Sequence, residues 1–130
     1  MNKILTSAVA LSMVLFASAG FAGPKLLITH NTTDFESNAF VAGTIPSQHP
    51  TKAHSDNKVF WATVKLACFG HITNGKCPAL IKMKTDTAEP FDLGYVEMDM
   101  ASGVITPSEL HANGYTMLVN GIGESTLIKD

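Results

Sequence analysis

The sequence contains no arginine. Its nine basic residues are all lysines, and with eleven acidic residues the 130-residue chain has a formal net charge of −2. Arginine is the residue best suited to phosphates and guanine edges, because its planar guanidinium donates two parallel hydrogen bonds. No cluster of lysines replaces it, so neither a nucleic acid nor an anionic membrane surface is an expected partner.

Long apolar runs are also scarce, and the only one lies at the start of the chain. It extends from Ile4 to Phe21, follows the single charge of Lys3 and ends in small residues. This layout is typical of a secretory signal peptide. We expect the signal peptide to occupy residues 1–22, with cleavage after Ala22 or, as the second choice, after Ala19.

An uncleaved membrane anchor is the competing interpretation of this run. The run is barely long enough to span a bilayer and has no basic flank on its far side, so a cleaved leader is favoured. Cleavage leaves one domain over residues 23–130, which is long enough to bury a single hydrophobic core. The sequence therefore predicts a secreted or periplasmic protein that does not insert into a membrane after signal removal.

Cysteine is limited to two residues, Cys68 and Cys77. An even number of cysteines in an exported chain predicts a disulfide. Closing a loop of about ten residues contributes somewhat less than about 3 kcal/mol on the chain-entropy model. The spacing matches neither the C-x-x-C redox motif nor the usual zinc pattern, so a structural bridge is favoured over a redox or metal-binding pair.

A helical apolar period is missing from the mature part, so little helix is expected. Short segments rich in β-forming residues are separated by turn residues instead. The clearest is Lys58–Cys68, where apolar residues alternate from Phe60 onward, and this alternation predicts a half-buried strand. The expected strands are Lys25–Thr32, Asn38–Ile45, Lys58–Cys68, Ala79–Thr85, Leu93–Met100, Val104–Thr106, Tyr115–Asn120 and Ser125–Lys129.

Turn pairs such as Asn74-Gly75 and Asn113-Gly114 stand between these segments. Glycine accepts a positive φ and asparagine tolerates it, so these pairs are hairpin signals. Together the pattern predicts an all-β fold: an antiparallel immunoglobulin-like β-sandwich of about seven or eight short strands with one disulfide. A small β-barrel is the alternative.

Trp61 is the single tryptophan, and its role depends on which side of its segment faces the core. If Phe60 and its alternate neighbours face inward, Trp61 is left outside as a binding surface for a ligand or another chain. In a sandwich, however, a central-strand tryptophan often packs in the core. The sequence leaves both interpretations open.

The longest irregular segment, Pro46–Asn57, contains His49 and His54. Its prolines keep it out of a central strand, and a loop of this length is either functional or merely mobile. Because imidazole is the commonest metal ligand, His49 and His54 form a candidate Cu or Zn site. Their spacing matches no established metal signature, so the main expectation is a protein without a cofactor.

No G-x-S-x-G, S-x-x-K or H-E-x-x-H motif occurs, and no catalytic residue is predicted. The favoured function is non-catalytic binding of another protein, a glycan or a surface. The alternatives are a periplasmic metal-binding protein and a small hydrolase whose site is assembled in space. A further alternative is homo-oligomerisation through an edge strand such as Lys25–Thr32.

The leader, the segment from Lys25 to Thr33 and the Cys68–Cys77 pair together resemble small exported proteins of Gram-negative bacteria. The resemblance covers the layout and no defined motif, so it implies no activity. Asn31-Thr32-Thr33 fits the acceptor pattern for N-glycosylation, which matters only in a eukaryotic protein.

Overall fold

The computed structural model describes residues 23–130, so the predicted signal peptide of residues 1–22 lies outside the described residues. The elements in chain order are β1 (Leu26–Asn31), β2 (Ser37–Val41), β3 (Ile45–Pro46), β4 (Ser55–Phe60), α2 (Trp61–Cys68), β5 (Lys76–Met83), β6 (Phe91–Asp99), β7 (Ile105–Thr106), β8 (Glu109–Ala112), β9 (Tyr115–Gly121) and β10 (Glu124–Lys129). Within this part of the chain, no helix is long and apolar enough to cross a membrane.

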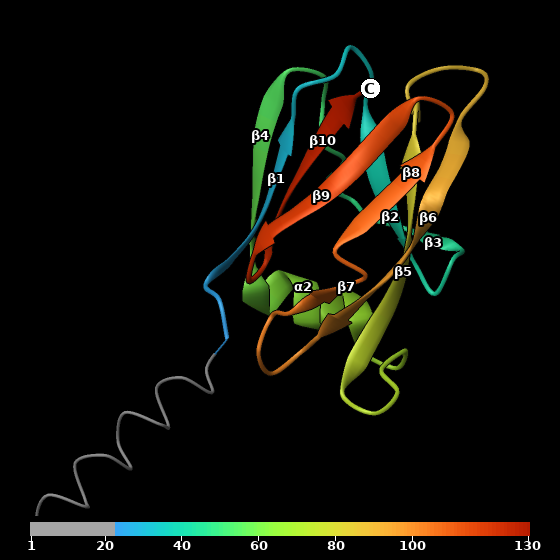
Figure 1. Ribbon diagram of the computed structural model, residues 1–130. Helices are drawn as coiled ribbons and strands as arrows, with labels where there is room; N and C mark the ends of the chain where they lie inside the picture. The colour runs from blue at the N-terminus through green and yellow to red at the C-terminus, as the bar shows by residue number, and fades with distance from the viewer. Residues whose placement is uncertain (1–22) are drawn as a thin grey trace, which may run out of the picture.

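The strands form two five-stranded sheets that pack face to face (Figure 1). The first sheet has the order β4-β1-β10-β9-β8, and the second has the order β3-β2-β5-β6-β7. Neighbouring strands are antiparallel except β1 and β10, which run parallel. The two sheets share no strand, so the predicted β-sandwich is confirmed and the alternative of a single closed barrel does not apply.

The predicted strand Lys58–Cys68 is wrong over its second part, which forms helix α2. Trp61, Val64 and Cys68 are spaced three and four residues apart, and all three are buried on one face of the helix. The two-residue alternation was coincidental, because Leu66 is 76% exposed although the alternation placed it inward. Alanine, leucine and lysine within the segment are good helix formers, which favours the helical solution.

β8, just before Asn113-Gly114, was missing from the sequence prediction. β3 and β4 were predicted in part, because Ile45 and Lys58–Phe60 fall in predicted strands while the rest of each strand lies in the segment expected to be irregular. The two predicted turns are present, with positive φ at all four residues of Asn74-Gly75 and Asn113-Gly114. β4 pairs with β1 over six residues, so β1 is not the edge strand that the alternative of self-association through Lys25–Thr32 requires.

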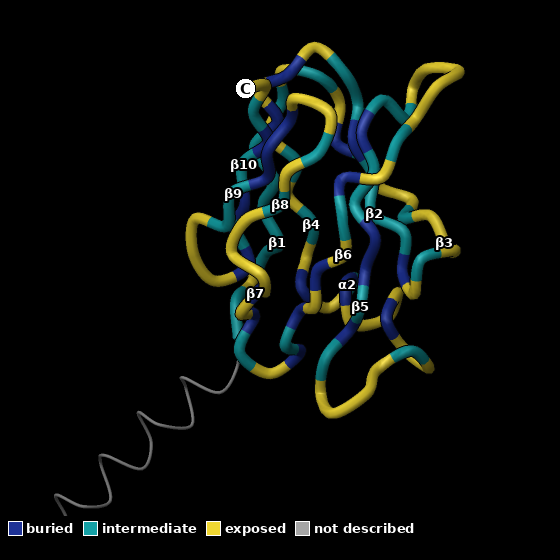
Figure 2. The backbone as a smooth tube through the Cα atoms, turned by 45° about the vertical axis from the view of Figure 1, so that its right-hand side comes forward, coloured by how far each residue is buried: buried dark blue, intermediate teal, exposed yellow. Residues whose placement is uncertain are grey.

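The core lies between the sheets, and Figure 2 shows buried stretches in both of them. Met83 and Leu127 are among the largest fully buried side chains, and Tyr115 packs with its ring 5.8 Å from that of Phe91. The predicted disulfide between Cys68 and Cys77 is confirmed and joins the end of α2 to the start of β5. It therefore fixes the helix against the second sheet.

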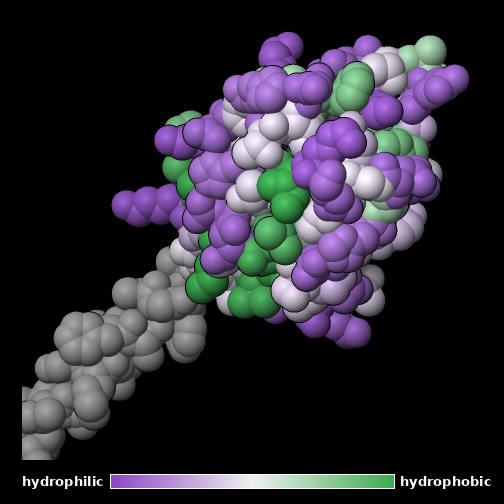
Figure 3. Space-filling view, turned by 45° about the horizontal axis from the view of Figure 1, so that its top comes forward, coloured by the Kyte–Doolittle hydropathy of each residue, from purple (hydrophilic) through white to green (hydrophobic). Residues whose placement is uncertain are grey.

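Apolar side chains also reach the surface. Figure 3 shows a band of hydrophobic side chains bordered by hydrophilic ones on the face that it presents. The most exposed large apolar residues belong to α2 and its ends, where Phe60, Leu66 and Phe69 are 70%, 76% and 81% exposed.

Candidate functional site

The candidate site lies between the two sheets, on the side where they separate. The sheets contact each other through β6, which packs on β8 and β9, and through β7, which packs on β9. The opposite side of the sandwich has β4 and β1 on the first sheet and β3 and β2 on the second. Helix α2 contacts β1 and β4 at the lower end of this side in Figure 1.

Small side chains at inward positions leave this side unfilled. Ala39 and Ala79 occupy neighbouring strands of the second sheet, and Thr29 lies beside Ser125 in the register of the first. All four line a cavity of about 440 Å³. That volume lies within the range of small-molecule binding sites in proteins, about 300–1,000 Å³.

The walls of the cavity are mainly apolar. Leu27 and Val59 lie opposite each other on β1 and β4, and both are only partly buried although they line the space between the sheets. Two methionines contribute flexible, polarizable side chains that can adapt to a ligand. The apolar lining comprises Leu27, Val41, Val59, Val64, Ile81, Val96, Met98, Ile105, Met117 and Leu127.

The segment predicted to be a long loop forms part of the cavity rim. Ser47, His49 and Thr51 line the cavity, and hydrogen bonds fix their backbone. The Asn57 amide donates to the carbonyl of His49 (2.8 Å) and to the hydroxyl of Thr51 (3.1 Å), while the Asn38 amide donates to the carbonyl of Ser47 (2.9 Å). The rim is therefore held in shape before any ligand arrives.

The cavity carries almost no charge. Among the described residues that line it there is no lysine, aspartate or glutamate, and His49 at the rim is the single ionisable side chain. Burying an ionised group without a partner is costly, because the group loses its hydration. The lining therefore favours an uncharged ligand.

Six hydroxyl side chains line the cavity, those of Thr29, Ser37, Ser47, Thr51, Thr63 and Ser125, and two of them lie side by side on the first sheet. Thr29 and Ser125 are neighbours in the parallel pairing of β1 with β10, and both line the cavity. Ser125 is only 5% exposed. Neither hydroxyl hydrogen-bonds to another group within residues 23–130. Thr29 is half-buried. A buried hydroxyl without a partner is unfavourable, so Ser125, with Thr29 beside it, marks a position where a bound molecule would supply a partner.

The two histidines that were proposed as metal ligands have different surroundings. His49 lies at the cavity rim, whereas His54 places its Nε2 2.6 Å from Oδ1 of Asp34. Across residues 23–130, no group of three or more His, Cys, Asp or Glu side chains is placed to hold a metal ion. The Cu or Zn site at His49 and His54 remains a prediction.

His30 lies between two carboxylates on neighbouring strands. Its Nε2 is 2.6 Å from Glu124 of β10, and its Nδ1 is 2.8 Å from Asp56 of β4. Only a protonated imidazole can donate both hydrogen bonds, so the bond to Glu124 and then the bond to Asp56 raise the pKa of His30 above its usual 6.5. The charged form ties β10, β1 and β4 together.

A second polar group lies at the other edge of the first sheet. Thr116 donates from its hydroxyl to Oδ1 of Asp130 (2.6 Å), and Nδ1 of His111 lies 2.7 Å from the same hydroxyl. Nε2 of His111 pairs with Glu109. None of these residues, nor His30, lines the cavity, so the histidine and carboxylate pairs do not face a space where a substrate would bind.

Trp61 is buried, with 4% of its surface exposed. Its indole Nε1 donates to the carbonyl oxygen of Met100. The interpretation of Trp61 as an exposed binding surface therefore does not hold, because the segment is helical and turns the indole inward. The core interpretation is the one that applies.

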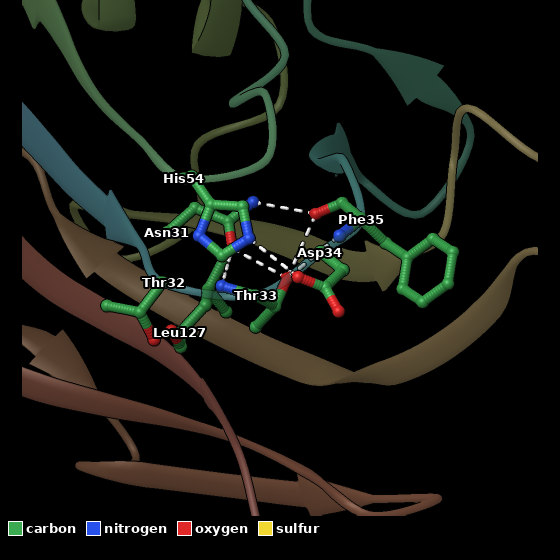
Figure 4. Close-up of polar contacts among 7 residues, drawn as sticks. All are labelled: Asn31, Thr32, Thr33, Asp34, Phe35, His54 and Leu127. Carbon is green, nitrogen blue, oxygen red and sulfur yellow. Dashed lines mark hydrogen bonds and ion pairs between the residues drawn. The ribbon is translucent and has the colours of Figure 1, made fainter.

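The Asn31-Thr32-Thr33 pattern is a structural turn (Figure 4). Asn31 is 2% exposed; its amide nitrogen donates to the carbonyls of Phe35 (2.8 Å) and Thr51 (3.3 Å), and its Oδ1 accepts from the backbone and hydroxyl of Thr33. The backbone nitrogen of His54 donates to the carbonyl of Thr33. These bonds join the end of β1 to the rim segment, and so help to position the cavity entrance.

The cavity itself was not predicted from the sequence. The one available signal was the pair of alanines at alternate positions of strands that are otherwise lined with larger apolar residues. Alanine is common in any core, so that signal alone could not indicate a cavity.

The fold and the site define a β-sandwich with an apolar cavity between its sheets and one disulfide. A family model described as "NttC: T2SS substrate NttC" matches residues 1–130. The chain belongs to this family of type II secretion system substrates.

The chain is similar to a protein of solved structure, described as the crystal structure of the Legionella pneumophila type II secretion system substrate NttC. The two share 56% sequence identity with a TM-score of 0.81, and the match covers 83% of this chain and 100% of the other. No curated protein matches the chain. These findings agree with the predicted secreted or periplasmic localisation and replace the general resemblance to small exported proteins with a specific family.

Proposed function

We propose that the protein is exported through the type II secretion system and acts as a non-catalytic binding protein whose cavity takes a small, mostly apolar ligand. The observation that carries the proposal is the cavity of about 440 Å³ between the sheets. A densely packed interior would leave no such space, because cores are normally filled to crystal-like density. Small residues at inward positions on both sheets account for the cavity, so the sequence itself encodes it.

The chemistry of the lining favours an apolar ligand over a glycan. Sugars are bound by groups of polar side chains together with exposed aromatic rings. Polar side chains line part of this cavity, but within residues 23–130 no Phe, Tyr or Trp does. Each buried methylene group contributes about 0.8 kcal/mol to binding. A ligand with several such groups would bind through the hydrophobic effect alone, even without specific hydrogen bonds.

Catalysis receives no comparable support. The histidines that contact carboxylates lie outside the cavity. His49 at the rim contacts no carboxylate within residues 23–130. General acid or base catalysis requires such a group within hydrogen-bond reach of the substrate. The proposal is therefore limited to binding.

The test uses an uncharged fluorescent probe, N-phenyl-naphthylamine, titrated into the mature protein. We expect saturable binding with a blue-shifted emission. Ala39→Phe should fill the cavity and weaken probe binding at least about tenfold, since the ring would occupy the space between the sheets. The matched control is Ala62→Phe, because Ala62 is exposed on α2 and does not line the cavity.

Circular dichroism and melting curves establish that each variant is folded before the titration is interpreted. Absence of saturable probe binding by the folded wild-type protein would overturn the proposal. Equal weakening by Ala39→Phe and Ala62→Phe would also count against it, because the probe would then bind elsewhere.

A further inference from the structure

We infer that the ligand is an uncharged, largely apolar molecule carrying a hydroxyl or carbonyl oxygen, and that Thr29 and Ser125 recognise this oxygen. The inference rests on the proposed function, since it names the class of molecule that the same cavity would take. In addition, Thr29 and Ser125 would make the polar contact to this ligand.

The two hydroxyls lie next to each other on one face of the first sheet. The backbones of Thr29 and Ser125 are paired in the register of β1 and β10, so their side chains project from the same face of the first sheet. Leu27 and Leu127, two residues away on the same strands, also line the cavity. The hydroxyls therefore form one polar site with an apolar residue before and after it along the strands, while Asn57, which pairs with Thr29 from β4, borders it on one side.

This polar site is largely buried and lacks a hydrogen-bond partner in the described part of the chain. Ser125 is 5% exposed, and its hydroxyl has no partner within residues 23–130. Other buried polar residues of the sandwich are satisfied: Ser37 donates to the carbonyl of Lys82 (2.8 Å), and Asn31 makes the bonds described above. A hydroxyl can both donate and accept, so the pair suits either an alcohol or a carbonyl oxygen.

The described residues around this polar site carry no charge. No cationic or anionic side chain among the described lining residues could pair with an ionised group placed beside Ser125, and His49 belongs to the rim segment. An ionised carboxylate or ammonium at this depth would lose its hydration without compensation. An uncharged molecule of the same length would not carry that cost.

The experiment compares four molecules with the same ten-carbon chain length, roughly the size suited to a small pocket: decanol, chlorodecane, decanoate and decylammonium. Each is used to displace N-phenyl-naphthylamine below its aggregation concentration. We expect decanol to displace the probe about tenfold more effectively than chlorodecane, the difference expected for one buried hydrogen bond. Decanoate and decylammonium should be weaker than decanol.

Two variants test the assigned residues directly. Ser125→Ala and Thr29→Val remove the hydroxyls with little change in shape, and together they should abolish the preference for decanol over chlorodecane. The affinity for the apolar probe should stay unchanged in both, which separates a lost contact from a damaged cavity. The matched control is Ser108→Ala, because Ser108 is exposed and does not line the cavity.

The outcomes separate this inference from the proposed function. If the probe does not bind to the folded protein, the proposed function itself fails. If the probe binds but decanol and chlorodecane displace it equally, or if Ser125→Ala and Thr29→Val keep the preference, the cavity is a binding site and the assignment of its polar contact is overturned. Stronger displacement by decanoate or decylammonium would overturn the inference that the ligand is uncharged.

Discussion

Trp61 donates a buried hydrogen bond of 3.1 Å from its indole Nε1 to the carbonyl oxygen of Met100. Trp61 begins α2, and Met100 directly follows β6, so this bond joins the helix to the end of the second sheet. The disulfide holds the other end of the same helix. α2 is thus fixed at both ends beneath the cavity.

Replacing Trp61 should destabilise the protein strongly. Trp61→Phe leaves the Met100 carbonyl without its donor and should lower the free energy of unfolding by about 1–3 kcal/mol. Trp61→Ala also leaves a cavity and should cost about 3–5 kcal/mol. Chemical denaturation measures both values. Phe60→Ala is the control, because Phe60 is 70% exposed; a similar loss there would contradict the assigned role of Trp61.

Removing the disulfide should also reduce stability. The double variant Cys68→Ala, Cys77→Ala should lower the free energy of unfolding by about 2–3 kcal/mol, because the unfolded chain regains the freedom of the closed loop. The measurement is urea denaturation of the variant beside the wild-type protein with and without a reducing agent. Reduced wild type and variant should agree. Equal stability of the oxidised wild type and the variant would show that the bridge contributes nothing.

Stability should fall with rising pH through the titration of His30. Its pKa is raised in the folded state, so its contribution is fully present below the unfolded value near 6.5 and is lost as pH rises through the higher folded value. The melting temperature of the wild type should therefore decrease relative to His30→Gln on going from about pH 6 to about pH 8. The control His71→Gln should follow the wild-type profile. Parallel curves for wild type and His30→Gln would contradict the prediction.

Asn31 should tolerate substitution poorly in spite of its place in a glycosylation pattern. Asn31→Ala removes two donated and two accepted hydrogen bonds inside the structure and should cost at least about 2 kcal/mol of unfolding free energy. Asn120→Ala is the control, because Asn120 is exposed and accepts a single bond from Thr126. Denaturation curves that overlap for the two variants would refute a structural role for Asn31.

Copper and zinc should leave the melting temperature unchanged. A metal that binds only the folded state raises that temperature in proportion to its affinity. His54 already pairs with Asp34, and His49 lies at the rim of the cavity without further ligands assembled around it in the described part of the chain. Thermal shift with each metal measures the effect. A stoichiometric rise that disappears in His49→Ala would establish the metal site instead.

The layered architecture could be predicted from the sequence because it depends on features that repeat. The alternation in β5, β6, β9 and β10 and the Asn-Gly turns specify local geometry, and the predicted export signal indicated that the two cysteines form a disulfide. α2 could not be assigned in the same way. The segment Trp61–Cys68 satisfies a period of two and a helical period together, and packing of Trp61 and Val64 decides between them.

The candidate site was less accessible to prediction. His49, which the sequence predicts as a metal ligand, also lies at the rim of the cavity, and its metal-binding role stays a prediction. Thr29 and Ser125 could not be selected from the sequence, because serine and threonine are common in strands. Their significance arises only when β1 and β10 lie side by side. Parallel pairing of two distant strands leaves no local signal in the sequence, unlike a hairpin, whose turn can be recognised.

That same pairing has a consequence for how the molecule assembles. His30 and Glu124 touch although 94 residues separate them along the chain. The strand next to β4 therefore gains its second neighbour only after nearly all the intervening polypeptide has been made. Topologies built on such remote contacts fold slowly, so a newly synthesised copy stays exposed to proteases and aggregation until its last strand is in place.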